Sequence, residues 1–176
     1  MNLTQAQLLT YLQQHQIPYQ LYQHAPVFTC EAATKVIEEL QIPGVGIKNL
    51  FLKDSKQRLY HIVATYHTRV DLKKTGAELG AKELRFANAE LLMQHLGVEP
   101  GSVTPLALIN DVEHTVQIIV DVDLFKHDLI QVHPLNNDAT VVITPADLIK
   151  FFTLLQRSYI TYDFTQNCVV PTSPVP

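Results

Sequence analysis

The spacing of apolar residues along the chain predicts helices that alternate with short strands. Near the start, apolar positions recur at helical intervals after Thr4, which can form a capping box with Gln7, so the first helix is expected to end near His15. The same spacing predicts further helices over Cys30 to Leu40, Asp71 to Leu79, Ala89 to Leu96 and Thr144 to Leu155. Asp71, Asn88 and Thr144 are the expected caps of the last three.

Runs rich in β-branched and aromatic residues predict the strands. The clearest are Ile47 to Lys53 and Arg58 to Thr65, which flank a polar turn and therefore indicate a β-hairpin. Helices interspersed among hairpin-linked strands indicate an α+β fold, with a central mixed, largely antiparallel sheet surrounded by helices. The other predicted strands are Tyr19 to Tyr22, Lys82 to Phe86, Leu106 to Ile109, Thr115 to Val122, Leu129 to Val132 and Ala139 to Ile143.

The length of 176 residues is typical of one domain. The apolar pattern fades after Tyr159, and the last residues are rich in proline. We therefore expect a single domain over residues 1–157 and a loosely ordered C-terminal tail over residues 158–176. No apolar run approaches the roughly 18 residues of a membrane span, and no basic signal-peptide start is visible, so no membrane partner is expected.

Charge is distributed unevenly along the chain. The net charge of −4 argues against wholesale nucleic-acid binding, but residues 48–85 carry nine Lys/Arg against four Asp/Glu, whereas residues 86–176 carry three against ten. The basic stretch is compatible either with a local nucleic-acid contact or with an ordinary solvated surface. Cys30 and Cys168 lie far apart and match no metal or redox spacing, which favours reduced thiols and a cytoplasmic location.

Motif tests exclude several kinds of catalytic site. Ser102 does not lie in a Gly-x-Ser-x-Gly elbow, which argues against a serine hydrolase. The histidine pairs, such as His61 with His67, lack a nearby third ligand, so no metal site is predicted. The Gly44-Val-Gly46 segment lacks the further residues of a nucleotide-binding loop. No cofactor is therefore expected.

The segment from Gly97 to Asp111 is the strongest candidate for a structured binding loop. Gly97 can end a helix, and Pro100-Gly101 and Pro105 restrict the backbone on either side of Ser102-Val-Thr104. The three N–H groups between Gly101 and Pro105 have no predicted partner, and buried donors need one. An oxygen atom of a ligand is a suitable acceptor for them.

Three other residues are candidates for the same site, each with a simpler explanation. Lys48 is expected on the apolar Leu50 side of its strand, either reaching solvent along its stem or projecting into an anion-binding pocket. Asn49 can stabilise a strand end, and His133 before Pro134 can complete a turn. Spacing alone does not show that these residues converge.

The chain carries, in this order, His24-Ala-Pro-Val-Phe-Thr29, Lys48-Asn-Leu-Phe-Leu-Lys-Asp54, Gly97-Val-Glu-Pro-Gly-Ser-Val-Thr-Pro105, Leu108-Ile-Asn-Asp111, Val132-His-Pro-Leu-Asn136 and Thr144-Pro-Ala-Asp-Leu148. Together these segments resemble the motifs of the YbaK/prolyl-tRNA-synthetase-associated editing domain family, over roughly residues 1–155. The match is closest to the freestanding branch that deacylates alanyl-tRNA(Pro). A departure lies at Ala25, where relatives often have proline, and the residues after Leu155 have no match.

The resemblance implies roles for individual residues in a hydrolytic pocket. Lys48 is similar to the family's pocket lysine, Asn49 to the asparagine beside it, and His133 to its pocket histidine. The Gly101 to Pro105 segment is similar to its Gly-x-x-x-Pro loop, whose N–H groups suit an oxyanion. The implied catalytic residues are Lys48, Gly101, Ser102, Val103, Thr104, Pro105 and His133, and the implied substrate-binding residues are Asn49, His24 and Phe28.

The resemblance therefore implies a trans-editing aminoacyl-tRNA deacylase that hydrolyses alanyl-tRNA(Pro), with help from the substrate's own ribose hydroxyl. Its partners would be the acceptor end of the mischarged tRNA and, transiently, prolyl-tRNA synthetase or an elongation factor. Alternatives are an editor of the same fold that acts on cysteinyl-tRNA(Pro) or another mischarged tRNA, a non-catalytic module that binds tRNA or a synthetase, and a hydrolase of free amino-acid or other small esters.

Overall fold

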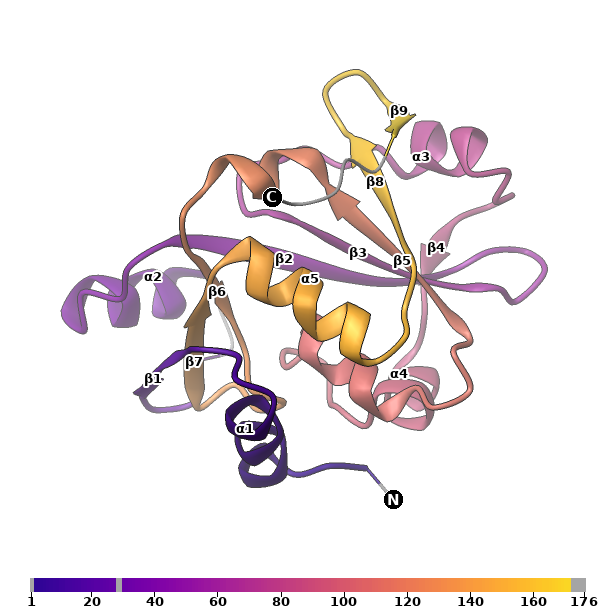
Figure 1. Cartoon of the computed structure of the whole chain (residues 1–176). Helices are drawn as coiled ribbons and strands as arrows, with labels where there is room; N and C mark the ends of the chain where they lie inside the picture. Colours follow the sequence, from indigo (N-terminus) through magenta and orange to yellow (C-terminus); the bar gives the residue numbers. More distant parts are fainter. Residues whose placement is uncertain (1, 28–29, 172–176) are drawn as a thin grey trace.

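The computed structural model describes residues 2–27 and 30–171 (Figure 1). Within these residues the strands form one mixed sheet in the order β1-β7-β6-β2-β3-β5-β8-β9, with β4 paired to β2. The helices are α1 (Gln5–Gln14), α2 (Cys30–Glu39), α3 (Leu72–Glu78), α4 (Ala89–Leu96) and α5 (Pro145–Leu154), with the 3-10 helices η1 (Pro105–Asn110) and η2 (Val122–Lys126). The strands are β1 (Gln20–Gln23), β2 (Val45–Lys53), β3 (Leu59–Thr65), β4 (Arg85–Phe86), β5 (Val116–Asp121), β6 (Ile130–Val132), β7 (Ala139–Ile143), β8 (Tyr159–Asp163) and β9 (Cys168–Val170).

The pairing confirms the predicted mixed, largely antiparallel sheet. Among the described residues, β2 pairs antiparallel with β3 from Ile47↔Thr65 to Lys53↔Leu59, as the predicted hairpin requires. The pairs β1–β7, β2–β4, β6–β7 and β8–β9 are also antiparallel, whereas β2–β6, β3–β5 and β5–β8 are parallel. The long hairpin therefore joins two smaller groups of strands into one sheet.

Helices cover both faces of this sheet, and the larger core lies on one of them. Buried residues of α1, α4 and α5, such as Leu8, Leu96 and Phe152, belong to the same apolar cluster as Phe51 and Val63 of the hairpin. Figure 1 shows these three helices on the near and lower side of the sheet, with α3 away from them beside β8 and β9. A second cluster, which includes Leu52 and Tyr162, packs with residues around α3.

Local side-chain caps explain where the helices begin. Thr4 and Gln7 form the predicted capping box at α1, because each accepts from the backbone of the other. Asp71, Asn88 and Thr144 accept hydrogen bonds from the first turns of α3, α4 and α5. These caps were predicted from the sequence, and the structure confirms them.

The predicted strand Leu106 to Ile109 is wrong, because this segment is part of η1. Pro105 occupies the first turn, and the Thr104 side chain caps the helix by accepting from Leu106 N–H at 3.3 Å. Leu106, Ala107 and Leu108 are all buried. In a short apolar run that is buried on every side, polar residues do not recur at regular intervals. The pattern of the run therefore does not distinguish a strand from a helical turn.

The predicted loosely ordered tail over residues 158–176 is also corrected for its described part. Strand β8 pairs with β5 in parallel from Ile118↔Tyr159 to Asp121↔Tyr162, and β9 returns antiparallel beside it. Tyr162 is fully buried in the second apolar cluster. Strands β8 and β9 therefore complete the sheet, and residues 172–176 lie outside the described residues.

A buried ion pair connects the end of α5 to the start of β5. Arg157 Nη1 donates to Asp111 Oδ2 at 2.7 Å, and both side chains are almost fully buried. Burial opposes ionisation of Asp111, but hydrogen bonds from Val116 N–H, Thr115 and Arg157 outweigh it and hold the pKa of this carboxyl below its usual value. The acid that ends the Leu108-Ile-Asn-Asp111 motif is therefore a structural residue.

Replacing Asp111 by alanine is expected to lower the free energy of unfolding by about 3–5 kcal/mol, because Arg157 would remain as a buried charge without its partner. The matched control is Asp123→Ala, which removes an exposed pair with Lys126 and should cost at most about 1 kcal/mol. Urea titration of both variants measures the difference. Because the pKa of Asp111 is lowered, its contribution is present above about pH 4 and is lost on further acidification. Equal losses in the two variants would contradict this role.

None of the helices in residues 2–27 and 30–171 is long and apolar enough to span a membrane.

Candidate functional site

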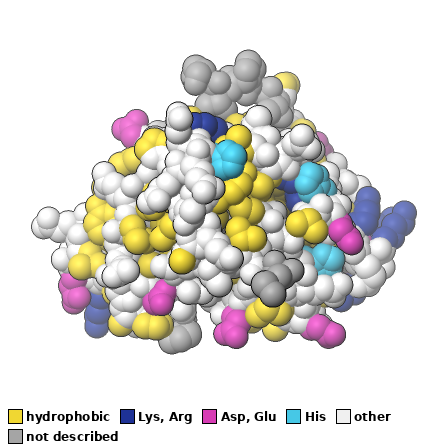
Figure 2. Space-filling view, turned by 60° about the horizontal axis from the view of Figure 1, so that its bottom comes forward, with side chains coloured by type: hydrophobic (Ala, Val, Ile, Leu, Met, Phe, Trp, Pro, Cys, Tyr) yellow, Lys and Arg dark blue, Asp and Glu magenta, His cyan; other side chains and the backbone are white. Residues whose placement is uncertain are grey.

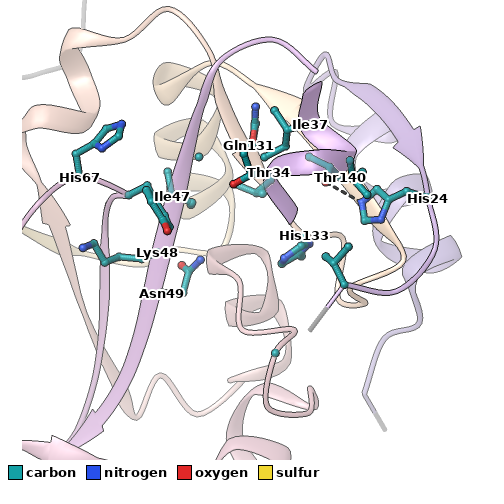
Figure 3. A pocket seen from close by; sticks show the side chains of 16 residues that line it. His24, Thr34, Ile37, Ile47, Lys48, Asn49, His67, Gln131, His133 and Thr140 are labelled. Atoms are coloured by element: carbon teal, nitrogen blue, oxygen red, sulfur yellow. Dashed lines mark hydrogen bonds between the residues drawn. The ribbon is translucent and has the colours of Figure 1, made fainter. Parts of the chain in front are cut away.

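A pocket of about 390 Å³ opens where β2 and β6 stop pairing. These parallel strands pair only at Val45↔Ile130 and Gly46↔Gln131, and the residues that follow on each strand border the pocket. The gap between the strands explains how neighbouring residues of β2 reach it from opposite sides of the strand (Figure 3). The lining residues are His24, Val27, Thr34, Val36, Ile37, Gly46, Ile47, Lys48, Asn49, Tyr66, His67, Gly101, Gln131, Val132, His133 and Thr140.

Lys48 borders the pocket, and its ammonium group is held by the loop after β3. Lys48 Nζ donates to the carbonyl oxygen of Thr68. The Thr68 hydroxyl in turn donates to Asp121 and lies 2.7 Å from the hydroxyl of Thr65. This small network fixes the backbone group that Lys48 contacts, so the lysine is placed by β2, β3 and the end of β5 together.

Asn49 also lines the pocket and is oriented by a residue of the neighbouring strand. The ring Nε2 of His61 lies 3.1 Å from Asn49 Oδ1. His61 is fully buried, and burial together with the positive charge of Arg157 lowers its pKa to about 3. The imidazole is therefore neutral at physiological pH.

His133 lines the pocket, and one of its two ring nitrogens is engaged in a hydrogen bond with the backbone. Its Nδ1 is 3.1 Å from the carbonyl oxygen of Ala139, which can only accept, so Nδ1 carries the proton. Burial lowers the pKa of His133, the carbonyl of Ala139 partly opposes this, and the nearby His24 lowers it further. The neutral ring therefore keeps a lone pair on Nε2, and Figure 3 shows His133 facing Asn49.

His24 is held near His133 by the first residues of β7 and by the turn that precedes them. Its Nδ1 donates to the Ala25 carbonyl at 2.9 Å, and its Nε2 lies 3.0 Å from the Thr140 hydroxyl (Figure 3). Asn137 Nδ2 donates to the Val27 carbonyl at 3.0 Å, and Val27 N–H donates back to the Asn137 carbonyl at 3.2 Å. The segment after β1 is thereby attached to the turn that carries His133.

Of the predicted loop residues, Gly101 alone is among the residues that line the described pocket. Its φ of +93° lies in a region that favours glycine. The expectation that three N–H groups of this loop lack partners is wrong for Ser102, whose N–H donates to the Glu99 carbonyl at 3.0 Å. Ser102, Thr104 and Pro105 are buried outside the pocket lining, and Val103 packs against the main core.

The structure thus brings Lys48, Asn49, Gly101, His133 and His24 to one pocket. Phe28, also predicted to bind substrate, lies outside the described residues. The convergence depends on the pairing of β2 with β6 and on the turn after β6, which are long-range features of the fold.

Several pocket residues were missed by sequence reasoning. Gln131 donates to the carbonyl oxygens of Ile42, Pro43 and Gly44 and so ties β6 to the turn before β2. A polar residue inside the apolar β6 strand was the available signal for it. Tyr66 and His67, whose rings meet edge-on with centroids 5.7 Å apart, follow the end of β3 and gave no such signal.

Positive charge is concentrated away from the pocket centre. In Figure 2, Lys and Arg side chains gather at the right-hand edge, the side on which the β2–β3 turn lies in Figure 1. That turn carries Lys56 and Arg58, both exposed. The described residues hold no group of three or more His, Cys, Asp or Glu side chains able to bind a metal ion.

Comparison with known proteins identifies relatives of this chain. The profile of the aminoacyl-tRNA editing domain matches residues 24–151. The zebrafish (Danio rerio) prolyl-tRNA synthetase associated domain-containing protein 1 is 39% identical over 144 residues, which cover 81% of this chain and 77% of the relative. The prolyl-tRNA editing protein ProX of Acetoanaerobium sticklandii is 34% identical over 140 residues, which cover 79% of this chain and 84% of the relative.

Solved structures share the fold at lower sequence identity. The structure of a candidate trans-editing enzyme for prolyl-tRNA synthetase superposes with a TM-score of 0.64 at 18% identity, covering 93% of this chain and 98% of the other. The profile match spans more than half of the chain, and both relatives exceed 30% identity over most of it. The chain therefore belongs to the aminoacyl-tRNA editing domain family.

Proposed function

We propose that this protein is a trans-editing deacylase that hydrolyses the ester bond of mischarged alanyl-tRNA(Pro). The observation that carries the proposal is the convergence of Lys48, Asn49, Gly101 and His133 on one pocket. Its volume of about 390 Å³ lies in the range of small-ligand sites. The family membership and the names of the relatives support the same conclusion.

The reaction needs stabilisation of negative charge on the ester carbonyl oxygen. Water adds to the carbonyl carbon, the bond to the ribose oxygen then breaks, and that oxygen takes a proton as the amino acid leaves. Donors placed around the developing oxyanion accelerate such steps, and one of them is worth about 3 kcal/mol. The Lys48 ammonium and the backbone at Gly101 supply these donors, while Lys48 also suits a phosphate of the terminal nucleotide.

His133 contributes as an acceptor. Since its Nδ1 donates to the Ala139 carbonyl, Nε2 offers a lone pair to the attacking water, the substrate ammonium or a ribose hydroxyl. The ribose hydroxyl beside the ester assists in activating water. This division of roles requires no metal ion or cofactor from the protein.

Deacylation is expected to depend on the neutral form of His133. Because burial lowers its pKa, the neutral form persists at pH 6.5 and is lost only as the pH falls through the lowered pKa. Rates measured from pH 7.5 downwards, after subtraction of spontaneous hydrolysis, should therefore hold steady above pH 6.5 and fall only on further acidification. The variant His133→Gln should have a lower rate, and its rate should not show this fall on acidification. A rate that rises on acidification in the wild type would contradict the assignment.

The proposed substrate class follows from the size and polarity of the pocket. Ile37, Ile47 and Val132 border the pocket and suit a small apolar side chain. One methylene changes binding by only about 1–3 kcal/mol, so a synthetase that activates proline benefits from a second site that removes alanine. The exposed basic side chains of the β2–β3 turn are candidates for contact with the tRNA acceptor stem, and any contact with the synthetase or an elongation factor would be transient.

The direct test is release of labelled alanine from alanyl-tRNA(Pro) by the purified protein. The proposal predicts multiple turnovers at a rate well above that of buffer alone. A non-catalytic tRNA-binding module would instead bind the tRNA and leave the ester intact. Binding without release would therefore refute the proposal.

A further inference from the structure

A buried histidine on β3 takes no direct part in the proposed hydrolysis. His61 is fully buried in a strand whose neighbouring residues, from Leu59 to Ala64, are otherwise apolar or aromatic. Its Nδ1 has no hydrogen-bond partner among the described residues. A buried polar atom without a partner destabilises a fold, so an apolar side chain would be favoured here on grounds of stability alone.

The hydrogen-bond pattern determines which ring nitrogen carries the proton. The neutral imidazole has one N–H, and Asn49 offers either its carbonyl oxygen or its NH₂ group to Nε2. If the NH₂ group faced His61, Nδ1 would have to carry the proton and would be a buried donor without an acceptor. Orphaned buried N–H groups are rarer than unpaired acceptors. The favoured arrangement therefore has Nε2–H donating to Asn49 Oδ1.

This arrangement fixes the chemistry that Asn49 presents to the pocket. With Oδ1 held by His61 at 3.1 Å, the NH₂ group of Asn49 faces the opening, and Figure 3 shows its nitrogen on the side of His133. Asn49 is therefore a hydrogen-bond donor to whatever occupies the pocket. Without His61, the amide could rotate and present its oxygen to the same place.

We propose that His61 is a positioning residue for the pocket: its Nε2–H holds the Asn49 amide so that the NH₂ group donates to an oxygen of the aminoacyl ester or of its ribose. The inference rests on the proposed deacylase function, which it deepens. His61 lies behind the pocket wall, acts through Asn49 and does not touch the substrate.

The kinetic test is a double-mutant cycle on deacylation of alanyl-tRNA(Pro). His61→Leu should lower kcat by about 10-fold, the equivalent of one hydrogen bond, with KM little changed and thermal stability equal or higher. Once Asn49 has been replaced by alanine, His61→Leu should have no further effect on the rate. His61→Gln should recover part of the rate, because its amide can also donate to Asn49.

Val63→Ala is the matched control, because Val63 is fully buried, on the same face of β3 and opposite Asn49 in the hairpin. This variant should lower stability and leave kcat within about twofold, since it removes only packing. Additive effects of His61→Leu and Asn49→Ala, or an equal loss of kcat in Val63→Ala, would overturn the proposal.

An NMR measurement separates this inference from the proposed function. ¹⁵N-edited spectra of the His61 ring should show a proton on Nε2 and no titration between pH 5 and 8, in agreement with its low pKa. This result would support the hydrogen bond even if alanyl-tRNA(Pro) were not the substrate. A proton on Nδ1 would overturn the proposal whatever the enzyme hydrolyses, whereas an inactive wild type would refute only the proposed function.

Discussion

Replacing Lys48 by alanine is expected to lower the rate of alanyl-tRNA(Pro) deacylation by about 100-fold or more, the usual effect of losing one oxyanion donor. The fold should be retained, because the Lys48 side chain is only partly buried and its hydrogen bond goes to a backbone carbonyl of a loop that Asp121 also holds. Single-turnover kinetics with saturating protein measure the chemical step directly, and a thermal melt of the same sample reports on the fold.

Lys53→Ala provides the control for Lys48→Ala. Lys53 lies at the other end of β2, where its ammonium donates to Gln57 at 3.2 Å beside the exposed turn. It carries the same charge on the same strand but does not line the pocket. Its loss should change the chemical step by less than about twofold. Wild-type rates in Lys48→Ala, or equal losses in both variants, would contradict the role given to Lys48.

Gly101→Ala should be the second most damaging change, with an expected loss of about 100-fold in the chemical step. An alanine Cβ at this position would meet nothing closer than Asn137 Nδ2 at 3.9 Å, so the expected effect does not come from a clash. It comes from the φ of +93°, which an L-residue adopts only with strain. Relaxation of this strain would displace the loop, and small displacements in a catalytic site can cost about 100-fold in rate.

Gly80→Ala is the matched control for backbone strain. Gly80 has a φ of +62°, an alanine Cβ there would have no described atom within 4 Å, and the residue does not line the pocket. Both glycine variants should lose about 1–2 kcal/mol of stability, measured by urea unfolding. The rate should fall in Gly101→Ala alone, and a similar fall in Gly80→Ala would show that the strain acts on the whole fold.

Local features of the fold were predictable because their determinants lie close together in the sequence. The Thr4 capping box joins residues three positions apart, and the hairpin of β2 and β3 is joined by a short polar turn. Strand β8 was missed because its alternation is weak and it is fixed by parallel pairing with β5, some forty residues earlier in the chain. The 3-10 helix η1 was mistaken for a strand because it is buried on all sides. Its sequence therefore lacks the regular spacing of apolar and polar residues that distinguishes a helix from a strand.

The site shows the same division between local and distant determinants. Family resemblance identified Lys48, Asn49 and His133, but their meeting depends on the pairing of Val45 with Ile130, which no local pattern encodes. The tautomer of His133 depends on a contact with Ala139 across the following turn. His61, by contrast, could have been connected to Asn49 from the hairpin register, because both side chains lie on one face of adjacent strands.

The measurement that tests the central proposal most directly is deacylation of a panel of alanyl-, cysteinyl-, seryl- and prolyl-tRNA(Pro) under single-turnover conditions. The proposed function predicts rapid release of alanine, slower release of cysteine and serine, and protection of proline. Faster release of cysteine than of alanine would assign the pocket to a different mischarged tRNA. Absence of hydrolysis above the buffer rate for every member of the panel would contradict the deacylase function itself.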